Sequence, residues 1–275
     1  MAPPLPRREP ATLAFAVLGP LHAADDDGVI AIGSFKQRTV LGLLLCHPNQ
    51  TVSLAALNDA LWADFPPRTA RNTLQVHISA LRRILGPRRG PAGVVLRRGP
   101  TGYTLQVGAD QLDSIRFRDL AHRGRAAARD GDQSRAVDLL DRAIRLWRGP
   151  ALADLSEVPR LAVEAARLEE QFLLAYEDWA EAKLASGQPA QVLESIDELV
   201  RRHPLRERLL SARMLALYRL GRAAEALAQF DAARQLLARD LGLRPSPVLG
   251  RLYRSILTGD QALLTGLPQV WGRAA

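Results

Sequence analysis

The chain has 275 residues, of which 47% are hydrophobic and 24% are charged, a composition that fits globular domains and excludes wholesale disorder. Its net charge of +8 is concentrated in one place. Residues 66–109 contain eight arginines and no Asp or Glu, so the other 29 basic residues balance the 29 acidic ones. A local basic excess indicates a surface for a polyanion. The single cysteine, Cys46, excludes a disulfide framework and a cysteine-based metal site.

The amino-terminal part predicts a leader followed by short strands. Residues 1–11 are rich in proline and are expected to form a disordered leader. "LAFAVLGPLHA" predicts a strand broken at Gly19-Pro20, and "VIAIG" predicts a second strand after the turn "ADDDG". The three aspartates of that turn suggest a metal site, but no second cluster of acids or histidines supports one. A solvated hairpin turn is therefore the better interpretation.

Three helices and a hairpin follow in chain order. Ser34 and Gln37 predict a capping box at the start of a helix that ends near Pro48, and Ser53 caps a second helix in "LAALNDALWA". A third helix is predicted from about Thr69 to Leu85. "VVLRRGPTGYTLQV" then predicts a hairpin that turns near Gly99-Pro100. Short strands, three helices and a hairpin together predict a winged helix-turn-helix.

The third helix carries the strongest functional pattern. Leu74, Ile78, Leu81 and Leu85, joined by Ile84, form an apolar stripe that should pack on the first two helices. Ordinary solvated helices mix charges of both signs, and this acid-free segment does not. Small groups and hydrogen-bond donors on the opposite face are typical of a helix that enters a DNA major groove. That face presents Arg71, Asn72, Gln75, Val76, Ser79, Arg82 and Arg83, with His77 and Ala80 at its edges.

From Asp113 onward the hydrophobic period is helical, and an internal repeat is visible. Gly131, Gly187 and Gly221 align as turns between antiparallel helices, and the small residue five positions after each should let the helices approach closely. The last spacing, 34 residues, is the period of tetratricopeptide helix pairs. The expected fold class is therefore mainly α with a small β part: an amino-terminal winged helix followed by an all-α, tetratricopeptide-like repeat domain.

The residues do not support catalysis, and no cofactor or metal is expected. The five histidines fall in separate segments without ligand spacing, and neither a Gly-x-Ser-x-Gly motif nor a phosphate-binding Gly-x-x-x-x-Gly-Lys motif is present. No apolar stretch is long enough to span a bilayer. We expect a protein of the cytoplasm, associated with the nucleoid.

The order and spacing of several motifs resemble a known family. "PPRTARNTLQVHISALRRILG" followed by "GPTGYTL" resembles the OmpR-type winged helix of the Streptomyces antibiotic regulatory protein family. "LWRGPALADL", "HPLRERL", "MLALYRLGRAAEAL" and "LGLRPSP" resemble the bacterial transcriptional activation domain of the same family. The resemblance implies a DNA-binding domain at residues 12–109 and an activation domain at 113–260. Residues 261–275 are expected to form a weakly ordered tail.

The resemblance also implies a function and its partners. It implies an activator, pathway-specific for a secondary-metabolite (antibiotic) gene cluster, that binds direct repeats of double-stranded promoter DNA as a homo-oligomer. RNA polymerase holoenzyme would be recruited through its sigma and alpha subunits. The implied polymerase contact is the loop Asp64, Phe65, Pro66, Pro67 and Arg68. By position, phosphate contacts fall on Lys36 and Arg38, recognition-helix contacts on Arg71, Gln75, Val76, His77 and Arg82, and wing contacts on Thr101, Tyr103 and Thr104, beside Arg97 and Arg98.

The sequence departs from the family pattern at two positions and leaves alternatives open. Relatives commonly carry arginine at the position of Ala80 and often at that of Thr104. The resemblance therefore does not fix which DNA sequence this chain recognises. His77 has an alternative role as a neutral imidazole bonded to a backbone carbonyl. For the whole chain, an interaction scaffold built on the repeat array and a repressor that responds to a small ligand remain alternatives.

Overall fold

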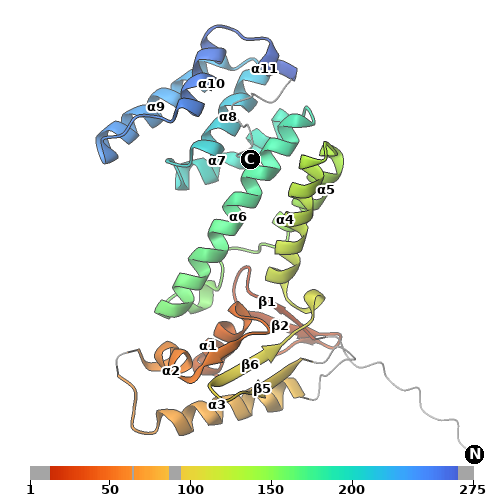
Figure 1. Ribbon diagram of the computed structural model, residues 1–275, viewed down its shortest axis with the longest axis vertical. Coiled ribbons are helices and arrows are strands. Elements are labelled where there is room, and N and C mark those ends of the chain that lie inside the picture. Colours follow the sequence, from red (N-terminus) through yellow and green to blue (C-terminus); the bar gives the residue numbers. More distant parts are fainter. Residues whose placement is uncertain (1–12, 64, 87–93, 266–275) are drawn as a thin grey trace, which may run out of the picture. The chain divides into compact units, whose positions relative to one another are not determined.

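The computed structural model describes residues 13–63, 65–86 and 94–265 (Figure 1). Contacts divide these residues into two compact units. Unit 1 comprises residues 13–120 and Ala143–Phe172, and unit 2 comprises Ala121–Arg142 and residues 173–265. The expected fold class is confirmed, because short antiparallel sheets and a winged helix come first and a series of helices follows. The predicted leader at residues 1–11 lies outside the described residues.

Unit 1 begins with a three-stranded antiparallel sheet of order β1-β2-β3. Phe15 pairs with Ala23, and both side chains are buried, whereas the turn at Asp26 and Asp27 is exposed. β1 and β2 each bury one residue, whereas both residues of β3 are exposed. The sheet consists of β1 (Ala14–Ala16), β2 (His22–Asp25) and β3 (Gly28–Val29).

The first two helices of unit 1 start where their caps predict. The Ser34 side chain accepts a hydrogen bond from the Gln37 amide, and the Gln37 side chain accepts one from the Ser34 amide at 3.1 Å. Ser53 Oγ accepts from the Ala56 amide at 3.1 Å. Both side-chain caps satisfy amides that the first helical turn leaves unpaired. The helices are α1 (Phe35–Cys46), α2 (Leu54–Trp62) and α3 (Ala70–Leu85).

A second three-stranded sheet, of order β4-β6-β5, completes the wing (Figure 1). The predicted hairpin is present, and the short strand β4 pairs with its second strand, a pairing that the sequence did not indicate. Gly102 makes this pairing possible, since a Cβ atom there would lie 1.9 Å from the Val52 carbonyl oxygen. The strands are β4 (Thr51–Ser53), β5 (Val95–Arg98) and β6 (Gly102–Gln106).

A buried carboxylate joins the first sheet to the start of the helical region. The side chain of Asp113, which is 7% exposed, accepts hydrogen bonds from the amides of Val17 at 2.9 Å and Leu18 at 3.0 Å. The loop at residues 17–19 also bonds to a later segment, because the amides of Arg148 and Leu152 donate to its carbonyl groups. Burial raises the pKa of the Asp113 carboxyl above its ordinary value, while these backbone donors oppose that shift.

Unit 1 continues past residues 109–113, where the two expected domains meet, and Asp113 is one of the residues that bond across this point. Residues 113–120 and Ala143–Phe172 pack with the winged helix instead of with the other helices. Asp154 reinforces the arrangement, since it accepts from the Leu21 amide and pairs with Arg38. Glu164 approaches His47 Nε2 to 3.4 Å. These partners are far apart in the chain, so hydrophobic periodicity does not reveal them.

Unit 2 is built of antiparallel helices joined by glycine turns. Gly131, Gly187 and Gly221 have φ angles of 85°, 71° and 76°, in the left-handed region where a side chain is strained. The residues five positions later, Ala136, Val192 and Ala226, are fully buried between helices, as the repeat predicts. The helices from Asp113 onward are α4 (Asp113–Arg129), α5 (Gln133–Ile144), α6 (Pro159–Ala185), α7 (Pro189–Arg202), α8 (Glu207–Arg219), α9 (Ala223–Leu241) and α10 (Pro247–Leu257); short 3₁₀ turns are η2 (Ala109–Gln111) and η3 (Ala153–Leu155).

The first residues of the expected weakly ordered tail are instead helical. Helix α11 (Ala262–Thr265) buries Leu263, and Arg219 Nε donates to the Leu263 carbonyl at 2.8 Å. One buried leucine and one charged donor fix this short helix on α8. The rest of the tail, residues 266–275, lies outside the described residues.

Replacing Asp113 with alanine should lower the free energy of unfolding by about 3 kcal/mol, because two buried amides would lose their acceptor. Urea unfolding followed by circular dichroism measures this change. Asp110→Ala, three residues earlier and exposed, is the matched control and should change stability by less than about 0.5 kcal/mol. Equal losses in the two variants would contradict the role assigned to the Asp113 carboxylate.

Candidate nucleic-acid interface

Helix α3 is held by the predicted apolar stripe. Leu74, Ile78, Leu81 and Leu85 are each 2% exposed or less, and α3 contacts α1 and α2. Ile84, at the edge of the stripe, is half-buried. Because four buried side chains at spacings of four, three and four fix the rotation of the helix about its axis, the opposite face must point to solvent.

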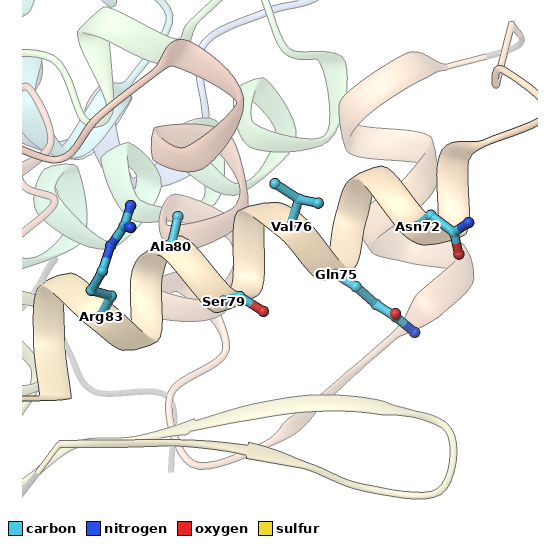
Figure 2. Close-up of a pocket in the computed structure, with 6 residues that line it drawn as sticks. All are labelled: Asn72, Gln75, Val76, Ser79, Ala80 and Arg83. Carbon is cyan, nitrogen blue, oxygen red and sulfur yellow. The ribbon is translucent and has the colours of Figure 1, made fainter.

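The opposite face of α3 forms a shallow depression of about 660 Å³ (Figure 2). Its polar members are hydrogen-bond donors or acceptors, and one arginine lies at its carboxyl-terminal end. Val76 stands among them with 65% of its side chain exposed. A helix face with this mixture matches the donor, acceptor and methyl groups at base edges in a major groove. The depression is lined by Asn72, Gln75, Val76, Ser79, Ala80 and Arg83.

Arg82 connects the recognition helix to the wing. Its Nε donates to the Leu96 carbonyl of β5 at 3.1 Å, and its guanidinium lies 5.8 Å from the centre of the Tyr103 ring. Nε, one of its five donors, is thus committed to the protein, although the side chain is still exposed. Arg82 therefore orients β5 and β6 against α3, which is a positioning role that sequence spacing alone does not show.

The wing presents fewer contacts than predicted. Tyr103 is only 3% exposed, so its prediction as a DNA contact is wrong; it faces the interior because strand residues alternate. Thr104 is half-buried, and its hydroxyl lies 2.9 Å from that of Thr51. Arg97, Arg98 and Thr101 are exposed and remain available at the tip.

The two predicted phosphate contacts on α1 differ from each other. Arg38 pairs with Asp154 and donates to the Leu21 carbonyl at 3.0 Å, so its charge is neutralised within unit 1 and it leaves the candidate interface. Lys36 stays in it. Its ammonium lies 5.0 Å from the centre of the Trp62 ring, a cation–π contact that leaves its hydrogens for other acceptors.

His77 lies at the edge of the interface. Both of its ring nitrogens are buried, and neither has a hydrogen-bond partner among the described residues. The alternative in which the imidazole bonds to a backbone carbonyl is therefore wrong for this part of the chain. Desolvation, with a smaller contribution from the Lys36 charge, lowers the pKa of His77, so the neutral ring is favoured near neutral pH.

The loop between α2 and α3 is exposed. Phe65 has 88% of its side chain exposed, and Pro66, Pro67 and Arg68 are exposed as well. Ala63, with a φ of 46°, ends α2 immediately before the loop. The predicted member Asp64 lies outside the described residues. A highly exposed phenylalanine beside two prolines is an apolar projection of the kind that protein interfaces favour.

Other candidate sites are not supported within the described ranges. Residues 13–63, 65–86 and 94–265 contain no group of three or more His, Cys, Asp or Glu residues arranged to hold a metal ion. In the same ranges, no helix combines the length and apolar character that a membrane crossing requires. The α3 face, with Lys36 and the wing tip beside it, is therefore the candidate site.

Arg83→Ala and Arg82→Ala should separate direct contact from positioning. Arg83→Ala should flatten the dependence of duplex affinity on salt by about one ion and leave stability unchanged. Arg82→Ala should weaken binding and also lower the free energy of unfolding by about 1 kcal/mol, because its link to Leu96 is lost. Anisotropy titrations between about 50 and 200 mM salt and urea unfolding measure the two effects. Unchanged stability of Arg82→Ala would contradict the positioning role.

Comparison with known proteins matches both parts of the chain. The profile of the bacterial transcriptional activator domain matches residues 112–257, and that of the carboxyl-terminal domain of transcriptional regulatory proteins matches residues 32–105. The transcriptional regulator RedD of Streptomyces coelicolor is 39% identical, over 90% of this chain and 71% of RedD. The regulatory protein DnrI of Streptomyces peucetius is 37% identical, over 92% of this chain and 95% of DnrI.

A longer relative and a solved structure are also similar to this chain over most of its length. The regulatory protein AfsR of Streptomyces coelicolor is 39% identical over 94% of this chain, which spans 26% of AfsR. The structure of Mycobacterium tuberculosis EmbR in complex with a low affinity phosphopeptide matches with a TM-score of 0.84 and 35% identity, covering 90% of this chain and 66% of that one. The chain thus belongs to the Streptomyces antibiotic regulatory protein family of DNA-binding transcriptional regulators, which are not enzymes.

Proposed function

We propose that the chain is a sequence-specific transcriptional activator of a secondary-metabolite (antibiotic) gene cluster. The observation that carries this proposal is the exposed face of α3, which offers donors, small groups and Arg83 in a segment without a carboxylate. In the proposed complex this face enters the major groove. The exposed wing tip, with Arg97 and Arg98, reaches a neighbouring minor groove, and Lys36 holds a phosphate.

Family membership supports the proposed target and arrangement on DNA. A single helix face reads only a few base pairs, so one copy specifies too short a sequence to select a promoter. Two copies bound side by side on direct repeats, about one helical turn apart, would double that sequence. Binding as a homo-oligomer on promoter DNA is therefore part of the proposal, and it implies association with the nucleoid.

The loop Phe65–Arg68 is the proposed contact with RNA polymerase holoenzyme, through its sigma or alpha subunits. Support comes from the exposure of Phe65 and from its place in the chain, five residues before α3 begins. A loop next to the recognition helix lies close to DNA whenever α3 is bound. A weak contact there raises the local concentration of polymerase at the promoter, and no covalent chemistry is needed.

Selection of bound sequences from a random duplex library, at near-physiological salt, tests the DNA-binding part of the proposal. We expect a short direct repeat at helical spacing, with affinity at least about 10³-fold above that for random duplex. Recovery of no motif, together with binding that disappears as salt rises, would contradict sequence-specific recognition.

Phe65→Ala tests the polymerase contact. The variant should bind the selected repeat with unchanged affinity, because Phe65 lies outside α3, and should lose most of its activation in a reconstituted transcription assay. Val29→Ala is the control, since Val29 is also highly exposed, at 76%, in unit 1. If Phe65→Ala activates as well as the control, the loop is not the contact. If the unaltered chain lowers transcription from a promoter with the repeat, the protein is a repressor.

A further inference from the structure

Two apolar side chains interrupt the polar face of α3. Val76 and Ala80 are four residues apart, so they lie one above the other on the helix surface. Figure 2 shows both projecting from the same edge of α3, while Gln75 and Ser79 project from the adjoining edge. The two therefore form a narrow apolar strip inside the depression, between Asn72 and Arg83.

Packing within the protein does not account for this strip. The buried stripe lies on the other side of α3, and Val76 remains 65% exposed. Valine also favours a helix less than alanine does, so helix propensity does not account for it. Exposure alone is not diagnostic, since Val163 of α6 is 69% exposed. The distinctive feature of Val76 is its place in a depression whose other lining groups are polar or small.

A major groove offers one kind of apolar group to such a strip. The edges of adenine, guanine and cytosine present hydrogen-bond donors and acceptors there, whereas thymine also presents its C5-methyl group. A valine side chain beside that methyl would bury apolar surface on both partners. A polar base edge at the same place would instead be covered by a group that cannot pair with it.

We infer that Val76 and Ala80 are specificity-determining residues that read the C5-methyl groups of thymines. The inference rests on the proposed binding of α3 in the major groove. Four residues of α-helix rise about 6 Å and base pairs are about 3.4 Å apart. Two methyl contacts made by this strip are therefore about two base pairs apart. Gln75 and Asn72, beside the strip, are suited to a neighbouring adenine.

Removing single methyl groups from the DNA tests this inference without altering its hydrogen bonds. In the duplex selected by the full chain, each thymine is replaced in turn by deoxyuridine. Loss of one buried methyl should weaken binding about fourfold at one or two positions in each repeat, and elsewhere the affinity should not change. Val76→Ala should show the same loss on the unaltered duplex and no further loss when deoxyuridine replaces the thymine that it reads.

The control is Val163→Ala, an equally exposed valine outside α3, which should bind and respond to deoxyuridine as the unaltered chain does. Failure to select any motif would overturn the proposed function and, with it, this inference. A selected motif whose affinity is insensitive to deoxyuridine at every thymine would overturn only the methyl reading. The same would follow if Val76→Ala kept the full sensitivity of the unaltered chain.

Discussion

The burial of four side chains on one side of α3 is the constraint on which the rest of the interface depends. Leu74, Ile78, Leu81 and Leu85 fix the rotation of the helix, and each contributes about 1.5–3 kcal/mol by leaving water. Turning α3 by one residue would expose this stripe and push Gln75 or Ser79 into the core. The residues that can meet DNA are therefore chosen by packing, before any contact with DNA is made.

In the proposed complex with DNA, the charged residues and the packed α3 face make separate contributions to recognition. The arginines of the acid-free segment would attract the phosphates of any duplex, whatever its sequence, and this attraction weakens as the salt concentration rises. In the proposed complex, the small, polar and apolar groups of the α3 depression discriminate among base edges. Arg82 belongs to both parts, because it carries charge and also ties β5 to the recognition helix. In the proposed complex, this link between β5 and α3 lets the wing and the recognition helix contact neighbouring grooves together.

Local sequence patterns predict most of the helices and turns of this protein. Contacts between residues far apart in the chain are not predicted by such patterns. The caps at Ser34 and Ser53, the stripe of α3 and the glycine turns depend on residues a few positions apart, and all are found. Arg38 was predicted at the interface from its position in the family resemblance, which does not show its partner Asp154, 116 residues away. The Asp113 carboxylate, 96 residues from Val17, was missed for the same reason. For Tyr103, strand alternation was the available signal, and it indicates burial.

The placement of α3 in a major groove is the central claim, and a cleavage probe attached to the helix tests it directly. Cys46 is buried, and burial raises the pKa of its thiol to about 12, so an introduced surface cysteine would be the reactive one. Ser79→Cys carrying an iron chelate should cut the selected duplex within each repeat. The cuts on the two strands should be offset from each other in the direction typical of cleavage from the major groove. The same chelate on Ser156→Cys, also an exposed serine of unit 1, should not cut within the repeats. Equal cleavage from the two positions, or a minor-groove stagger from Ser79→Cys, would contradict the account.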